Sequence, residues 1–249
     1  MTDTKDTTAL VVGGTTGIGL ATAIRFAQNG SRVAIAGRDN VHGAAALATL
    51  RSSGAEATYL TVDVQDSDSV TELVAAIVDK WGRLDYAFNN AGWEGIPGPL
   101  EKTSEDDWSR LIDLKLSGVW RGLRAQITQM RQQGHGAIVN MAGSWGLYGF
   151  PNYAAYCAAA HGVVGLTKAA ALEVAAANIR INAVCPGAVD APMLDRMVGG
   201  DAQAKHAFGQ QLAIGRICTP EEVANLVVWL CSPEASYING TAIPLDGGV

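Results

Sequence analysis

The sequence lacks the features that mark several large classes of protein. No apolar run reaches the roughly 18 residues that span a membrane, and the first ten residues contain neither a basic nor an apolar segment. We therefore expect neither a membrane span nor a secretory signal. Basic residues are in the minority, with 18 Lys and Arg against 24 Asp and Glu. The resulting net charge of −6 argues against a broad nucleic-acid surface.

Cysteine and histidine are few and unpatterned. The four cysteines (157, 185, 218 and 231) form no CxxC pair, and the four histidines have no metal-ligand spacing. Without a secretory signal, we expect reduced thiols and a cytoplasmic protein. We predict no metal site, because the spacings typical of one are missing.

Glycine, by contrast, is abundant, with 29 residues where average usage gives about 17. The glycines are scattered rather than gathered in a linker, and the apolar share of 48% is too high for a disordered chain. A chain of 249 residues buries roughly 70–75% of its unfolded surface on folding. We therefore expect a single domain over residues 1–249.

Short β-rich runs alternate with longer helical patterns. The β-rich runs lie at 9–13, 32–36, 57–62, 84–88, 136–141, 179–184 and 240–245. The helical patterns lie at 18–29, 40–53, 66–81, 104–132, 153–177 and 220–232. Nearly all-apolar strands between helices predict a parallel sheet covered on both faces. The fold class is thus α/β, a doubly wound Rossmann sheet of about seven strands that binds ligands at one edge.

The stretch 187–219 departs from this alternation. It contains Pro192 and the pair Gly199-Gly200, and its helical periodicity is weak. A long excursion between a strand and a helix is often a lid over a ligand site. A surface loop with a short helix explains the pattern equally well, so both interpretations stay open.

A glycine-rich loop follows the first predicted strand directly and opens a helix. Glycines at such a turn let the backbone approach a pyrophosphate, and the helix N-terminus supplies free N–H groups and a partial positive charge. A glycine motif in this context is much more specific than one by itself. We predict a phosphate-binding loop made of Gly13, Thr15, Thr16, Gly17, Ile18 and Gly19.

The Gly-x-x-x-Gly-x-Gly spacing, with the chain length, resembles the classical short-chain dehydrogenase/reductase family. Further matches follow in the family's order over about the full chain: Asp63-Val64, Asn89-Asn90-Ala91-Gly92, Pro186-Gly187 and Asp246-Gly247-Gly248. The resemblance implies hydride transfer between NAD or NADP and a carbonyl or secondary alcohol. It also implies that the cofactor contacts Asp63, Val64, Asn90, Ala91, Gly92, Pro186 and Gly187.

The end of the second strand bears on the choice of cofactor. An acidic residue there accepts the ribose 2′-hydroxyl of NAD, whereas an arginine suits the 2′-phosphate of NADP. This chain has Gly37 at the acidic position, followed by Arg38. We predict NADP bound by Arg38, with NAD, or no bound cofactor, as the alternatives. A solvated Arg38, or one paired with Asp39, would remove the preference.

The resemblance fails at most of the positions that the family uses for catalysis. Family members carry a tetrad of asparagine, serine, tyrosine and lysine. Tyr156 matches the tyrosine, but Ala160 stands at the lysine position and Gly143 at the serine position, while Lys115 replaces the asparagine. A cofactor-contacting threonine is likewise replaced by Ala191. A phenol, with an ordinary pKa near 10, needs a neighbouring cation to work near neutral pH.

Three explanations are open. The one we favour from the sequence is a catalytically impaired subunit that acts as the partner of an active paralogue. In the second, an active but atypical reductase uses Tyr156 with Lys115 in place of the missing lysine and Ser144 in place of the missing serine. In the third, a non-redox enzyme that moves a proton or removes water uses the same scaffold.

The expected substrate is a small-molecule carbonyl or alcohol. Trp93, Glu94 and Trp145 should ring the cleft at the sheet edge, where aromatic side chains favour a bulky or apolar molecule. A collapsed, empty pocket fits these residues equally well. Because the family is usually oligomeric, we expect a homo-oligomer or a mixed oligomer with an active paralogue.

Overall fold

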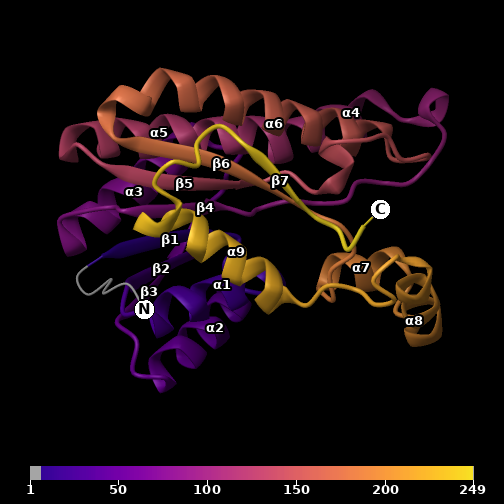
Figure 1. Cartoon of the computed structure of the whole chain (residues 1–249), viewed down its shortest axis with the longest axis horizontal. Coiled ribbons are helices and arrows are strands. Elements are labelled where there is room, and N and C mark those ends of the chain that lie inside the picture. Colours follow the sequence, from indigo (N-terminus) through magenta and orange to yellow (C-terminus); the bar gives the residue numbers. More distant parts are fainter. Residues whose placement is uncertain (1–6, 249) are drawn as a thin grey trace.

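A single parallel sheet forms the centre of the computed structural model, which describes residues 7–248 (Figure 1). Its strand order is β3-β2-β1-β4-β5-β6-β7, and every neighbouring pair is parallel. The strands are β1 Thr8–Val12, β2 Arg32–Gly37, β3 Ala57–Thr61, β4 Tyr86–Asn89, β5 Gly136–Met141, β6 Ile179–Pro186 and β7 Ala242–Leu245. The predicted doubly wound α/β sheet is confirmed.

Helices cover both faces of the sheet (Figure 1). One face packs against α1 Gly17–Gln28, α2 Asn40–Ser52 and α9 Pro220–Cys231. The other packs against α3 Ser67–Trp81, α5 Gly118–Gln133 and α6 Ala154–Val174. After β1 the chain crosses to β2, and after β4 it crosses to β5, on the opposite side. A crevice therefore forms outside the carboxyl ends of β1 and β4.

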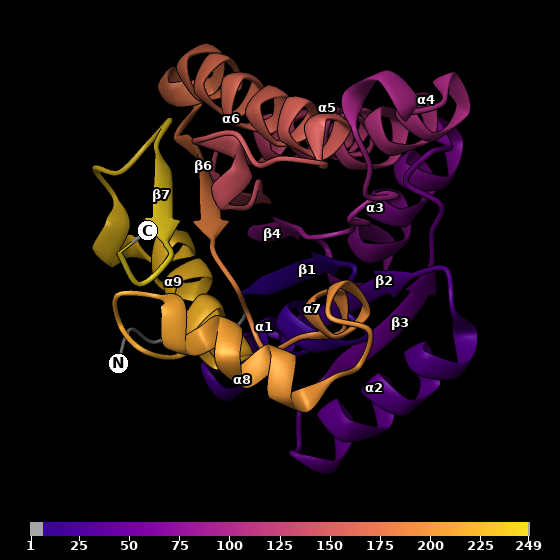
Figure 2. The ribbon, with the colours of Figure 1, turned by 90° about the vertical axis from the view of Figure 1, so that its right-hand side faces the viewer.

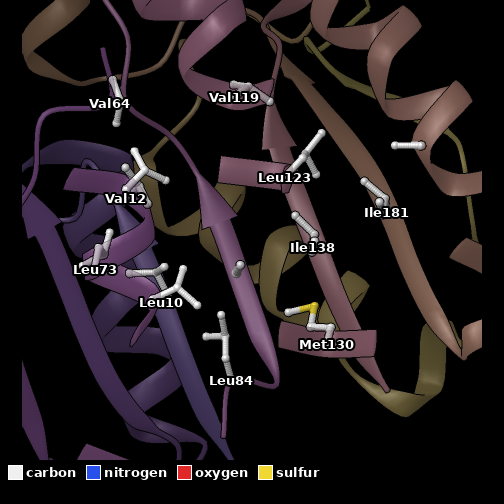
Figure 3. Close-up of a cluster of buried hydrophobic side chains, with 14 of the residues drawn as sticks. Leu10, Val12, Val64, Leu73, Leu84, Val119, Leu123, Met130, Ile138 and Ile181 are labelled. Atoms are coloured by element: carbon white, nitrogen blue, oxygen red, sulfur yellow. The ribbon is translucent and has the colours of Figure 1, made fainter. Parts of the chain in front are cut away.

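The core follows from the alternation of side chains along each strand. On β1, Leu10 and Val12 point toward one helical layer, while Ala9 and Val11 point toward the other. Figure 3 shows the first of these clusters, in which Leu10 lies near Leu73 of α3 and Leu123 of α5 lies near Ile138 of β5. Apolar burial on both faces explains why the strands are nearly all-apolar in sequence.

The continuous helix expected over 104–132 is wrong, because the segment is divided into three parts. Helix α4 covers Glu105–Ile112, a π-helical turn covers Asp113–Ser117, and α5 follows. The turn is clamped at its start, where the Asp113 carboxylate accepts hydrogen bonds from Gln65 Nε2 (2.9 Å) and Arg121 Nη2 (2.7 Å). A π-turn rotates the side chains that follow it relative to a regular helix. Lys115 lies within this turn.

The segment 187–219 contains two helices that its weak periodicity did not reveal. Helix α7 covers Pro192–Met197 and α8 covers Ala202–Gln211. Figure 2 shows both helices on the side of the molecule that faces the viewer, with α7 in front of the β1–α1 region. Lys205 of α8 donates to the carboxylates of Asp190 and Asp195, which ties α8 to α7.

Within residues 7–248, no helix has both the length and the apolar character that crossing a membrane requires.

Asp85 anchors the opposite end of the sheet from the crevice. Its buried carboxylate accepts bonds from the Thr8 N–H (2.8 Å), Arg83 Nη2 (2.5 Å) and His135 Nε2 (2.7 Å). Burial raises the pKa of Asp85, but the bonds from Arg83, Thr8 and His135 outweigh it, so the pKa lies below its usual value.

A lowered native pKa predicts how Asp85 contributes to stability. The contribution is present above the unfolded-state pKa, near 4, and is lost as the pH falls through the lower native value. We expect Asp85→Asn to cost roughly 1–3 kcal/mol of unfolding free energy at pH 6, with a smaller cost at pH 3. Urea unfolding at both pH values measures this. The exposed Asp79→Asn serves as the control, and an Asp85 cost that does not shrink in acid contradicts the account.

Candidate active site

A cleft of about 1080 Å³ opens at the carboxyl edge of the sheet. Its walls come from the β1–α1 loop, the ends of β2, β4, β5 and β6, the π-turn, α6, α7 and α8. The volume lies just above the roughly 300–1,000 Å³ typical of small-molecule sites. There is accordingly room for an extended ligand.

The predicted phosphate loop forms one wall of this cleft. Gly13 and Gly17 have positive φ angles of 73° and 51°. Gly19 lies so close to the loop that a Cβ there would come within 1.9 Å of the Gly13 carbonyl oxygen, so only glycine fits. Asn90 Nδ2 donates to that same oxygen at 3.0 Å and fixes the loop against the end of β4.

The N-terminus of α1 is free to accept an anion. Its N-cap, Thr16, makes no side-chain capping bond, and the first turn contains no acidic residue. Thr15, Thr16, Gly17 and Ile18 line the cleft. Uncapped N–H groups and the partial positive charge of the helix end suit a pyrophosphate. The loop therefore fits the phosphates of a dinucleotide.

Arg38 lies exposed at the end of this wall and lines the cleft. Its neighbour Asp39 caps α2 instead of pairing with it, accepting bonds from the N–H groups of Val41 and His42 and from His42 Nδ1 (2.7 Å). These bonds, the His42 N–H foremost, hold the pKa of Asp39 below its usual value. The sequence alternative in which Asp39 pairs with Arg38 is wrong for this structure.

The remaining predicted cofactor residues divide into two groups. Those that line the cleft are Val64, Asn90, Ala91, Gly92, Pro186 and Gly187. Gly19 and Asp63 do not line it. Gly19 supports the loop from behind, and the Asp63 carboxylate accepts the Gln65 N–H at 3.0 Å. Asp63 therefore shapes the chain between β3 and α3.

The three predicted catalytic residues gather in one place. Tyr156 of α6, Lys115 of the π-turn and Ser144 all line the cleft, and their residues are only 8%, 2% and 5% exposed. The Lys115 ammonium lies 4.3 Å from the centroid of the Tyr156 ring. A cation at this distance over an aromatic face is attracted to it. Lys115 is therefore a buried residue of the site, although a lysine on a helix is usually solvated.

Gly143 is crowded and Ala160 is buried at the two positions where the sequence resemblance places a serine and a lysine. Gly143 has a φ of 87°, and a Cβ there would lie 2.9 Å from the Tyr156 hydroxyl oxygen. Ala160 is fully buried, and its carbonyl oxygen would lie 2.9 Å from a Cβ on Gly146. The Tyr156 hydroxyl thus occupies the space beside Gly143.

Aromatic rings form the wall beside Tyr156. Trp145 stacks on Phe150 at 4.3 Å between centroids and meets Tyr156 edge-on at 5.4 Å. Tyr153 packs against Trp145 at 4.8 Å, and its pKa is raised by burial first and by the Glu94 carboxylate second. Of the residues expected to ring the cleft, Glu94 and Trp145 do so, whereas Trp93 lies under Arg110 instead.

The sequence did not predict that α7 and α8 would line the cleft, nor that Phe150 would. Lining side chains from these helices and the loop after them include Met193, Leu194, Arg196, Met197, Phe208 and Leu212. Arg196 donates two bonds of 2.7 Å to the nearly buried carboxylate of Glu94, across the cleft from α7. A Cβ on Gly17 would lie 3.1 Å from Pro192 Cδ, so α7 also packs on the phosphate loop. In the sequence, the apolar residues of α7 were the feature that could have indicated a helix packed against the cleft.

Comparisons with known proteins agree with this geometry. Residues 12–249 match the family profile described as Enoyl-(Acyl carrier protein) reductase. The chain is 36% identical to levodione reductase of Leifsonia aquatica, covering 98% of this chain and 94% of that one. It is also 36% identical to a 3beta-hydroxysteroid dehydrogenase of Mediterraneibacter gnavus, covering 96% and 93%.

Solved structures give the same result. The crystal structure of levodione reductase superposes with a TM-score of 0.94 at 36% identity, covering 98% of this chain and 97% of that one. The crystal structure of a single-residue variant of actinorhodin polyketide ketoreductase with NADPH superposes with a TM-score of 0.92 at 36% identity, covering 97% and 96%.

The crowding of Gly143 by the Tyr156 hydroxyl can be tested by substitution. Gly143→Ala should lower the free energy of unfolding by roughly 1–3 kcal/mol, because the new Cβ meets the Tyr156 hydroxyl and the φ angle is unfavourable. In a chain of this size the melting temperature should fall by about 2–4 °C per kcal/mol. Gly149→Ala is the matched control, since no atom lies within 4 Å of its Cβ position. Equal melting temperatures for the two variants would refute the crowding.

Proposed function

Because the chain belongs to the short-chain dehydrogenase/reductase family, we propose that it transfers hydride between NADP(H) and a carbonyl or secondary alcohol. The observation that carries the proposal is that a cofactor loop and a candidate acid–base pair line the same cleft. A loop that fits a dinucleotide pyrophosphate and the buried pair of Tyr156 and Lys115 line the same space. The matched relatives are named as reductases or dehydrogenases, which supports an active enzyme.

The walls favour a bulky, apolar substrate. Trp145, Phe150 and Phe208 present aromatic surface, and α7 adds Met193 and Met197. Phe150 and Phe208 are more than a third exposed, so they offer apolar area that a ligand can cover. One relative is named for a hydroxysteroid, which is consistent with a large apolar molecule.

The proposed chemistry divides between cofactor and protein. A bound nicotinamide dinucleotide supplies or accepts the hydride. In the reducing direction, the Tyr156 hydroxyl donates its proton to the substrate oxygen as negative charge develops there. The Lys115 ammonium stabilises the phenolate that remains, and the Ser144 hydroxyl orients the substrate oxygen.

The proposed cofactor is NADP. Arg38 is exposed, lines the cleft and has a neighbour, Asp39, whose carboxylate is engaged by α2. A guanidinium free to turn toward a 2′-phosphate favours NADP over NAD. The superposed ketoreductase structure contains NADPH, which supports the same choice.

Binding measurements test the cofactor proposal. NADPH should bind more tightly than NADH, and Arg38→Ala should weaken NADPH about 10-fold or more while leaving NADH unchanged, because one charge-assisted contact is lost. The exposed Arg25→Ala, on the outer side of α1, controls for loss of a surface charge. Tighter binding of NADH, or an Arg38→Ala variant with unchanged NADPH affinity, would overturn the assignment.

Activity measurements test the catalytic pair. Tyr156→Phe and Lys115→Met should each lower kcat/KM for ketone reduction by at least about 10²-fold, the low end for lost acid–base assistance, with NADPH affinity retained. Tyr237→Phe and Lys80→Met are matched controls on exposed residues and should be unaffected. A loss below about 10-fold in Lys115→Met would show that the ammonium takes no part.

A catalytically impaired subunit is the second candidate. It is favoured by Gly143 and Ala160, which stand where the family resemblance places a serine and a lysine, so that neither polar side chain is present. Such a chain would bind NADPH, assemble with an active paralogue and reduce nothing alone. Turnover by the purified chain that disappears in Tyr156→Phe excludes this candidate. An absence of turnover that only an added paralogue relieves would establish it.

A further inference from the structure

The Lys115 ammonium is buried in the cleft without an anionic partner. The residue is 2% exposed, and within residues 7–248 no hydrogen bond or ion pair reaches its Nζ. It lies over the Tyr156 ring, and its charge also acts on the buried Cys185 thiol, whose pKa is raised by burial and lowered by a smaller amount by Lys115. The Lys115 Nζ is not among the fully enclosed polar atoms of that part of the chain, so its three donors face the open cleft and can meet a ligand there.

The nearby carboxylates are already engaged. Asp113, two residues earlier, is held by Gln65 and Arg121. Glu94, which lines the same cleft, receives both of its bonds from Arg196. The pocket beside Tyr156 therefore presents a positive charge that neither of these carboxylates pairs with.

The backbone keeps this charge in place. The bonds at Asp113 clamp the start of the π-turn, and a Cβ on Gly118 at its end would lie 3.0 Å from Val64. The ammonium faces the ring of Tyr156, and the hydroxyl of Tyr156 points toward Gly143. The two polar groups thus lie side by side but can meet different atoms of one ligand.

We propose that Lys115 binds a second oxygen of the substrate, placed on the atom next to the reacting carbon. This inference rests on the proposed function, in which Tyr156 serves the reacting oxygen. The substrate class is then a bulky dicarbonyl, hydroxyketone or 2-oxo acid rather than a simple ketone. A ketone with one oxygen leaves the ammonium unmatched, whereas a second carbonyl or a carboxylate accepts its hydrogen bonds.

Calorimetric binding in the NADP⁺ complex, where no ketone can be reduced, tests the proposal. The three probes are cyclohexanone, cyclohexane-1,2-dione and cyclohexylglyoxylate, which offer one oxygen, two neutral oxygens and a carbonyl beside a carboxylate. We expect the dione and the oxo acid to bind at least about 10-fold more tightly than cyclohexanone, the low end for a hydrogen bond to a charged group. Whichever of the dione and the oxo acid has the lower dissociation constant shows whether the second oxygen belongs to a neutral or an anionic group.

The variant Lys115→Met should bring the three dissociation constants within about 3-fold of one another, because the charged donor is gone. Lys80→Met is the matched control, because Lys80 also lies over an aromatic ring, that of Trp81 at 5.6 Å, but is exposed. It should keep the preference. Equal affinities in the unchanged protein, or a preference that survives in Lys115→Met, would overturn the proposal.

Turnover of the same probes with NADPH separates the two levels of inference. If cyclohexanone is reduced but bound as tightly as the others, the second-oxygen site is wrong and the oxidoreductase proposal stands. If the preference is present in binding but no probe is reduced, the site stands and the oxidoreductase proposal is the part that fails.

Discussion

The order of the strands determines where chemistry can occur in this protein. Placing β1 beside β4 sends the chain in opposite directions from the two strand ends and opens a crevice between them. The glycine loop after β1 and the Asn90–Gly92 segment after β4 meet at that point, joined by the bond from Asn90 to the Gly13 carbonyl. Gly13 and Gly19 are required there because a side chain on either would collide with backbone. The π-turn, α6 and α7 then close the crevice into a cleft.

The polar groups around Tyr156 determine what chemistry the cleft can support. The Tyr156 hydroxyl lies beside Gly143, and Ala160 is buried one turn further along α6. A cation nevertheless lies beside Tyr156, supplied by Lys115 from the π-turn. The residue is only 2% exposed, and its ammonium lines the cleft next to the phenol. Stabilising a phenolate and holding a substrate oxygen both require a positive charge here.

Much of this could be predicted from the sequence, for identifiable reasons. The inner strands were evident because burial on both faces makes them almost wholly apolar. The half-buried edge strands stood out by their place, since β3 lies between two helical patterns and β7 follows the last one. The phosphate loop was evident because its glycines are required by close backbone contacts. The placement of Lys115 at the asparagine position also pointed to its neighbour in the structure, Tyr156.

Other features depend on three-dimensional contacts that leave weak local signals. The π-turn is stabilised by Gln65, which is remote in the sequence, so the 104–132 pattern resembles one helix. Helices α7 and α8 are held by Lys205 and by the Glu94–Arg196 pair rather than by an amphipathic repeat. The burial of Lys115 could not be predicted either, since a lysine in a helical pattern is usually exposed.

A double-mutant cycle on kcat/KM tests most directly whether Tyr156 and Lys115 act as a unit. The cycle compares the unchanged chain, Tyr156→Phe, Lys115→Met and the double variant. If the ammonium works through the phenol, the double variant should lose no more activity than the worse of the two single variants. Losses that multiply would show that the two residues act independently, and that the ammonium does not work through the phenol.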